Sequence, residues 1–177
     1  KAIGKVEPKS APRETTGGIE SPKETIEIAT TDENTTDKNP IVWKYSARRV
    51  SEKEYEIDFN ATLKEGYFIY SQYSNNSKGP MPTKFNIEGE GDRLKTIKRT
   101  EKGKNRIKKY DEHFDMTLTK FADYVTFTKK IKLERGSKKI TGQLYYVACN
   151  DEVCLPPKPV PFSVYLPSKI TSDKAAA

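Results

Sequence analysis

The sequence predicts an all-β fold, specifically an antiparallel β-sandwich, on three observations. Apolar and polar residues alternate in several short segments, turn-forming residues separate those segments, and no segment carries a 3.6-residue apolar stripe over eleven or more residues. About eight or nine such strands fit within the 177 residues of the chain. That number and their alternating faces are typical of a sandwich. A closed barrel is the second possibility, because periodicity alone does not show closure.

The clearest alternation runs from Tyr55 to Leu63, where every second residue is apolar. This pattern predicts a strand with one buried face and one solvated face. The same period, or a weaker form of it, predicts further strands at 41–47, 67–73, 83–89, 93–100, 114–120, 124–133, 140–148 and 160–166. Turn signals lie between them at 64–66, 78–82, 89–92 and 136–137.

Composition divides the chain into three parts. Residues 1–39 contain no aromatic residue and few aliphatic ones, which predicts a disordered or extended linker, with an edge strand at 25–29 as the alternative. Residues 40–168 hold Trp43 and every Tyr and Phe, and are the predicted domain. Residues 169–177 are a predicted tail ending in three alanines, as a vector scar does. The start at Lys1, without signal-peptide features, indicates a processed or trimmed product.

The chain is basic, with a formal net charge of +7, and no apolar run approaches the ~20 residues of a membrane-spanning helix. Residues 93–109 hold nine Lys and Arg residues with Glu101 as the single acid. This segment predicts either a solvated hairpin that turns at 102–104, or a surface that contacts nucleic acid or an anionic membrane. Because Tyr110 is the single aromatic residue beside it, a base-stacking platform is not supported, and we expect no nucleic-acid partner.

Two cysteines, Cys149 and Cys154, flank a short polar turn that contains Asp151 and Glu152. Three interpretations are open: a structural disulfide, a redox pair that exchanges disulfides with other proteins, or two free thiols. Closing a six-residue loop contributes only ~2 kcal/mol, so a structural role would add little stability. Two thiolates and His113 fall short of four zinc ligands, and no Gly-rich phosphate loop is present, so we expect no metal and no cofactor. Acids near a thiol would raise its pKa.

The residues around this pair resemble a known family. Val147–Cys149, Cys154–Pro157 and Pro159–Phe162 resemble the N-terminal periplasmic domain of the DsbD thiol:disulfide interchange proteins. Supporting similarities are Trp43 in a first strand, and the two segments 66–71 (Gly-Tyr-Phe-Ile-Tyr-Ser) and 78–83 (Lys-Gly-Pro-Met-Pro-Thr). The resemblance spans about residues 40–166.

The resemblance implies an immunoglobulin-like sandwich in the periplasm of a bacterium, with any membrane attachment in missing parts of a longer chain. It implies a protein-disulfide reductase that takes electrons from a thioredoxin-like domain and passes them to periplasmic disulfide isomerases or other thiol proteins. Cys149 and Cys154 would be the redox pair, with Cys154 forming the mixed disulfide and Cys149 resolving it. A non-enzymatic immunoglobulin-like binding module with a structural disulfide is the alternative.

The resemblance also implies a cap loop over the redox pair. The segment 110–114 is similar to that loop, with Asp111, Glu112 and Phe114 as its acidic and aromatic residues. Tyr70 matches a tyrosine that lines the site in the family, whereas Phe68 replaces a second one. The loop between the cysteines is one residue shorter than in the best-known member.

Overall fold

The computed structural model describes residues 35–74 and 77–171. The predicted linker up to residue 34, the alternative edge strand at 25–29 and the last six residues of the predicted tail lie outside the described residues. The described part of that tail is tied to the domain, because the Thr171 N–H donates to the Arg49 carbonyl oxygen at 2.9 Å.

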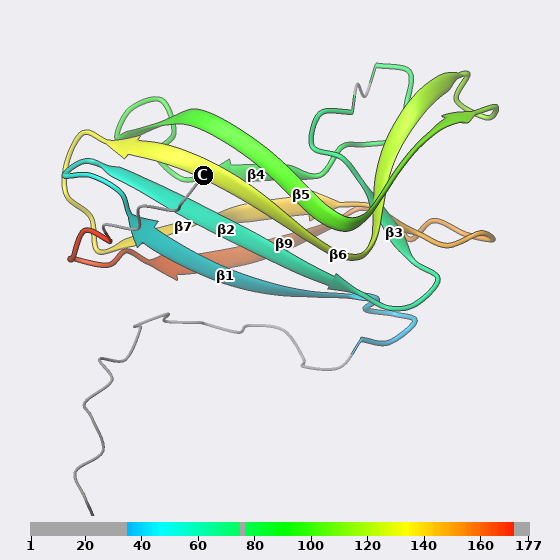
Figure 1. Ribbon diagram of the computed structural model, residues 1–177, viewed down its shortest axis with the longest axis horizontal. Helices are drawn as coiled ribbons and strands as arrows, with labels where there is room; N and C mark the ends of the chain where they lie inside the picture. Colours follow the sequence, from blue (N-terminus) through cyan, green and yellow to red (C-terminus); the bar gives the residue numbers. More distant parts are fainter. Residues whose placement is uncertain (1–34, 75–76, 172–177) are drawn as a thin grey trace, which may run out of the picture.

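Two antiparallel sheets make up the described part of the chain, which contains nine strands and no helix (Figure 1). One sheet has the order β1-β2-β6-β3-β8, with β5 paired along β6, and the other has the order β4-β7-β9. No helix that could cross a membrane is therefore found in these residues. The strands are β1 (Ile41–Arg49), β2 (Glu54–Leu63), β3 (Phe68–Tyr70), β4 (Lys84–Ile87), β5 (Leu94–Asp111), β6 (Met116–Leu133), β7 (Lys139–Tyr146), β8 (Ala148–Cys149) and β9 (Lys158–Tyr165).

The core lies between the two sheets, where the predicted alternation buries one face of each strand. In β2, Ile57, Phe59 and Ala61 are fully buried, and the residues between them are partly exposed. Phe59 of the larger sheet contacts Phe85 and Phe162 of the smaller one, with ring centroids 4.4 Å and 5.0 Å apart. The prediction of an all-β, immunoglobulin-like antiparallel sandwich is confirmed, and the closed barrel is excluded because the two sheets remain separate.

The predicted turn at 102–104 is wrong, because β5 continues through it for 18 residues and pairs with an equally long β6. A Cβ atom on Gly103 would overlap the Phe121 ring, lying 3.0 Å from its Cε1. The glycine therefore lets the strand pass close to the core and marks no reversal of the chain. Register shifts next to Lys98 and Gly103 bend the hairpin, whose outer half rises away from the sheets in Figure 1.

The basic residues of 93–109 are thus spread along a strand that pairs on one side alone. Successive side chains of a strand point to opposite faces, so these charges do not gather on a single surface. Charged residues, lysine above all, are common along sheet edges that do not pair with another chain, and the basic residues of β5 fit this pattern.

We predict that Gly142→Ala destabilises the domain strongly. Gly142 lies in β7 between β4 and β9, where a Cβ atom would overlap the Asn86 carbonyl oxygen and lie 2.7 Å from Phe162 Cζ. Overpacking of this kind costs about 1–3 kcal/mol of the free energy of unfolding, measurable by chemical denaturation. Gly136→Ala is the matched control, since no atom lies within 4 Å of its added Cβ. Equal stability of the two variants would contradict the close approach of β4 and β7.

Candidate active site

Cys149 is positioned by the pairing of β8 with β3. Phe68 lies opposite Cys149 and Ile69 opposite Ala148 in this short antiparallel ladder. The other edge of β3 pairs with β6, so β3 joins the cysteine strand to the rest of the sheet. The site lies at the end of the sandwich where the loop after β8 projects, on the right in Figure 1.

Cys149 and Cys154 form a disulfide, with their Cα atoms 4.0 Å apart and an S–S distance of 2.07 Å. Backbone hydrogen bonds close the same turn on both sides of the bridge, from Asn150 N–H to Val153 O at 2.9 Å and from Leu155 N–H to Ala148 O at 2.8 Å. The Asn150 side-chain oxygen also accepts hydrogen bonds from the Glu152 and Val153 amides, at 2.9 Å and 2.7 Å. The turn is therefore held by the chain as well as by the sulfur atoms.

The bridge excludes one of the three sequence-based interpretations of the cysteines, that of two free thiols. Neither cysteine is a free thiol in this structure. Among the described residues, no three His, Cys, Asp or Glu side chains are grouped as a metal site requires. A structural disulfide and a redox disulfide remain, and the surroundings of the two sulfur atoms bear on the choice.

The two cysteines differ sharply in exposure. Cys149 is fully buried, whereas Cys154 is exposed, as are the intervening residues Asp151 to Val153. A second protein can therefore reach the turn from the side of Cys154, while the scaffold covers Cys149. This asymmetry gives the two sulfur atoms different access to a reacting thiol.

Cys149 is buried in a small apolar cluster that is separate from the main core. Tyr70 and Leu118 are its other buried members, and both are about 5% exposed. The Tyr70 ring packs edge-on against the Phe68 ring, with centroids 5.7 Å apart. The partly buried side chains that complete the cluster are Phe68, Phe114, Met116 and Val147.

Phe114 reaches this cluster from the turn between β5 and β6. The Asp111 carboxylate shapes that turn by accepting hydrogen bonds from the His113 and Phe114 amides, at 2.9 Å and 3.2 Å. Asp115 adopts a positive φ of 52°, a conformation that Asp tolerates better than most residues, and its carboxylate accepts a hydrogen bond from the Tyr110 hydroxyl. The turn thus presents Phe114 toward the cysteine cluster.

Two lysines and one aspartate lie beside the cluster. Lys120 Nζ lies 3.8 Å from the centre of the Phe68 ring, a cation–π contact. Lys109, Lys120 and Asp111 line a small cavity of about 40 Å³ beside Tyr70. Burial, followed by the negative charge of Asp111, raises the pKa of the Tyr70 hydroxyl, so Tyr70 stays a neutral hydrogen-bond donor at physiological pH.

The residues named from the sequence have different positions here. Phe68, Tyr70 and Phe114 lie in the cluster with Cys149, and Asp111 shapes the turn. Glu112 is exposed and makes no hydrogen bond or ion pair with the described residues. Sequence reasoning missed Met116, Leu118 and Lys120. Counting every second residue onward from Phe114 reaches all three, which lie on one face of β6.

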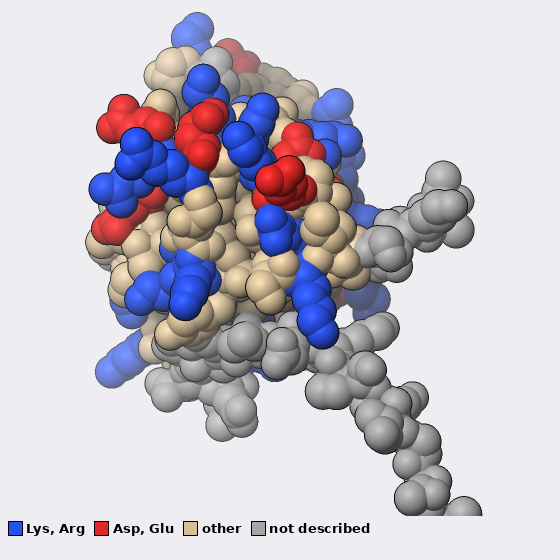
Figure 2. All heavy atoms as spheres, turned by 90° about the vertical axis from the view of Figure 1, so that its left-hand side faces the viewer, with Lys and Arg blue, Asp and Glu red and all other residues tan. Residues whose placement is uncertain are grey.

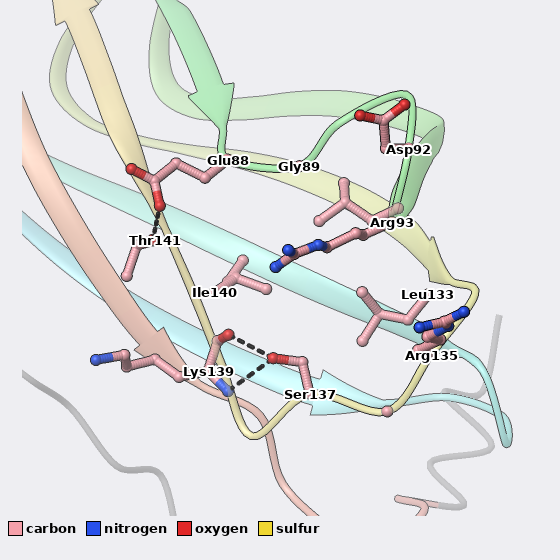
Figure 3. A pocket seen from close by; sticks show the side chains of 12 residues that line it. Glu88, Gly89, Asp92, Arg93, Leu133, Arg135, Ser137, Lys139, Ile140 and Thr141 are labelled. Carbon is pink, nitrogen blue, oxygen red and sulfur yellow. Dashed lines mark hydrogen bonds between the residues drawn. The ribbon is translucent and has the colours of Figure 1, made fainter.

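The opposite end of the sandwich has a different character. Its surface carries Lys and Arg together with Asp and Glu (Figure 2). A hollow of about 620 Å³ lies there between the turns that follow β4 and β6 (Figure 3). Buried Leu133 and Ile140 line it, whereas its charged residues are all exposed: Glu88, Asp92, Arg93, Arg135 and Lys139. This mixed, solvated rim does not point to a specific chemistry.

A known protein structure shares the fold. The N-terminal periplasmic domain of ScsB from Proteus mirabilis is 14% identical, with a TM-score of 0.53 over 73% of this chain and 48% of that one. This chain thus spans about half the length of that domain. The reduced DsbD N-terminal domain of Neisseria meningitidis is 17% identical, with a TM-score of 0.47 over 73% of this chain and 88% of that one.

A complex of the DsbD and PilB N-terminal domains, also from Neisseria meningitidis, gives 15% identity and a TM-score of 0.47 over 75% of this chain and 88% of that one. No curated protein sequence matches the chain significantly.

The family is established by a match to the whole domain. Residues 37–164 match the model of the family described as "Thiol:disulfide interchange protein DsbD, N-terminal". The matched residues include β1 to β8 and all of β9 except its last residue, together with Cys149, Cys154 and the turn that presents Phe114. The chain therefore belongs to the DsbD N-terminal domain family.

Proposed function

We propose that this chain is a periplasmic thiol:disulfide interchange domain that relays electrons from a thioredoxin-like donor to disulfide-containing partner proteins. The observation that carries the proposal is the disulfide between a fully buried Cys149, at the end of the edge strand β8, and an exposed Cys154. Membership of the DsbD N-terminal family supports the same chemistry. The activity is that of a protein-disulfide reductase.

The difference in exposure between the two cysteines supports a different step for each. In the reduced domain the Cys154 thiolate attacks a partner disulfide, forms the mixed disulfide and releases one partner thiolate. The Cys149 thiolate then attacks the Cys154 sulfur, re-forms the Cys149–Cys154 bond and releases the second partner thiolate. Two electrons pass to the partner, and each released thiolate takes up a proton. A donor dithiol later reduces the bridge by the same exchange in reverse.

The turn that carries Phe114 acts as a cap over the buried sulfur. Phe114, Phe68 and Tyr70 surround Cys149 with apolar atoms, which block the approach of small oxidants to its sulfur. Lys109 and Lys120 add positive charge at the edge of the same cluster, where an incoming partner would arrive. Glu112 is exposed at the tip of this turn and belongs to the surface that meets a partner.

The donor and the acceptors are proposed from the family rather than from contacts in the structure. A thioredoxin-like domain is the proposed donor, and periplasmic disulfide isomerases and related thiol proteins are the proposed acceptors. An oxidising extracytoplasmic compartment suits a domain that contains a disulfide.

We predict that Cys149→Ser traps a mixed disulfide through Cys154. The test partner is a thioredoxin-like protein that lacks its own second cysteine and whose remaining cysteine is activated as a mixed disulfide with a small aromatic thiol. Cys154 attacks the partner sulfur and releases the aromatic thiolate, and without the resolving thiol the resulting complex should persist on a non-reducing gel. The matched variant, Cys154→Ser, should form at least tenfold less complex, because its remaining sulfur is buried. Equal trapping by both variants would contradict the assignment of roles, and trapping by neither would contradict the relay.

The reduction potential separates the proposal from a structural disulfide. A structural bridge has a potential below about −300 mV, whereas an exchanging pair lies above it. Equilibration of the wild-type domain with a thiol–disulfide buffer series, read by mass spectrometry, gives the value. A potential below that limit would favour the alternative of a non-enzymatic binding module.

We predict that Phe114→Ala exposes the buried sulfur. In the Cys154→Ser background, Cys149 is the single thiol, and its reaction with a small aromatic disulfide reports its accessibility. Loss of the Phe114 ring should raise that rate about tenfold or more, because the ring packs on the cluster that covers Cys149. Tyr165→Ala is the control, since Tyr165 is a half-exposed aromatic residue in the other sheet. Equal rates in the two variants would show that Phe114 does not cover the sulfur.

A further inference from the structure

A lysine occupies a core position of β6. Every second residue of the strand from Val125 to Leu133 points between the two sheets, and each of these side chains is buried. Four of the five are apolar and at most 4% exposed, and the remaining one is Lys129, at 9%. Charged side chains are rarely buried to this extent unless an opposite charge accompanies them.

The Lys129 ammonium has no carboxylate within ion-pair distance among the described residues, although the charge of Glu90 acts on it from farther away. Its Nζ donates one hydrogen bond, to the Phe85 carbonyl oxygen at 2.7 Å, and makes no ion pair with a described carboxylate. An ammonium group carries three N–H donors, so two are left for other partners. Burial lowers the pKa of Lys129. The negative charge of Glu90 opposes this shift, and the positive charge of Arg99 adds to it.

Lys129 lines a cavity of about 360 Å³, whose other walls come from β4, from Arg99 of β5 and from the segment between β3 and β4. Arg99 lies directly opposite Lys129 in the β5–β6 register, so both side chains are on the same face of the sheet. The cavity lies in the usual size range of small-molecule sites. No carboxylate is among its described lining residues, whose charged and amide members are Lys129, Arg99, Lys84, Gln72 and Asn86.

The Arg99 side chain is held in place without an acidic partner. Its guanidinium lies over the Tyr73 ring, 4.8 Å from the centroid, and the Tyr73 hydroxyl donates to the Arg99 carbonyl oxygen at 2.6 Å. The nearby acid Glu101 is engaged elsewhere, accepting hydrogen bonds from the Ser71 hydroxyl and from the Gln72 amide at 3.0 Å. Among the described residues, no side chain or carbonyl group accepts from the guanidinium N–H groups of Arg99, which leaves them available to an anion.

We propose that this cavity binds a small polar molecule through an anionic oxygen group, a phosphate or a carboxylate, held by the Lys129 ammonium and the Arg99 guanidinium. The bound oxyanion supplies a counter-charge at ion-pair distance from the buried lysine and accepts its two remaining N–H donors. The guanidinium fork supplies paired donors of the geometry that such groups accept. This site is separate from the cysteine cluster, since no described residue is common to both.

The test is a ligand titration of the ¹⁵N-labelled domain followed by NMR, at constant ionic strength maintained with sodium chloride. Inorganic phosphate, glycerol 3-phosphate and succinate are the probes, which separate free phosphate, an organic phosphate and a carboxylate. At least one should give saturable shifts of the amides of 84–86, 99 and 129. Each probe replaces an equivalent ionic strength of sodium chloride, so the screening of the basic surface stays constant. Non-specific attraction of anions to that surface then does not produce saturation.

Lys129→Met should weaken that binding at least tenfold, because methionine keeps an unbranched side chain but removes the ammonium. Lys132→Met is the matched control, with the same change of charge at an exposed position of the same strand, and should bind as the wild type does. Should Lys129→Met fail to fold, Arg99→Gln with Lys98→Gln as its control decides the question. Absence of saturation with all three probes, or unchanged affinity in the Lys129 and Arg99 variants, would overturn the proposal.

Discussion

The short ladder between β3 and β8 is the constraint on which the site depends. Three residues of β3 join β6 on one side and the cysteine strand on the other, so Phe68 is paired with both Ala122 and Cys149. Every other part of the site is placed relative to this ladder. It fixes the buried sulfur against Tyr70 and Leu118, and it leaves the second sulfur on the outward turn.

Much of the sandwich could be predicted from the sequence, because burial on one side of a sheet imposes a period of two. The run from Tyr55 to Leu63 shows this directly, and the structure buries those same alternate residues. The β5–β6 hairpin could not be predicted in the same way. Lys102-Gly103-Lys104 has the composition of a turn, and the reason for its glycine is the Phe121 ring on the neighbouring strand, a tertiary contact.

The candidate site shows the same division. Cys149 and Cys154 could be found because their motif is local in sequence. Phe68, Tyr70 and Phe114 could be found because the segments that hold them resemble the same family. Leu118 and Lys120 lie more than 25 residues from the motif and reach it through the fold of β6, so no local pattern connects them. Lys129 breaks the apolar stripe of its strand, a visible signal, but its burial depends on the neighbouring sheet.

The turn between the two cysteines has a consequence for the energetics of a full redox cycle. Asn150 and the amides it binds, together with the Leu155–Ala148 bond, keep the chain reversal when the sulfur–sulfur bond is absent. The loop closed by the bridge is short, so opening it releases little chain entropy. The reduced and oxidised forms can then share one backbone. In the redox cycle proposed above, opening the bridge therefore requires little rearrangement of the backbone, and it removes only the ~2 kcal/mol that the short loop contributes.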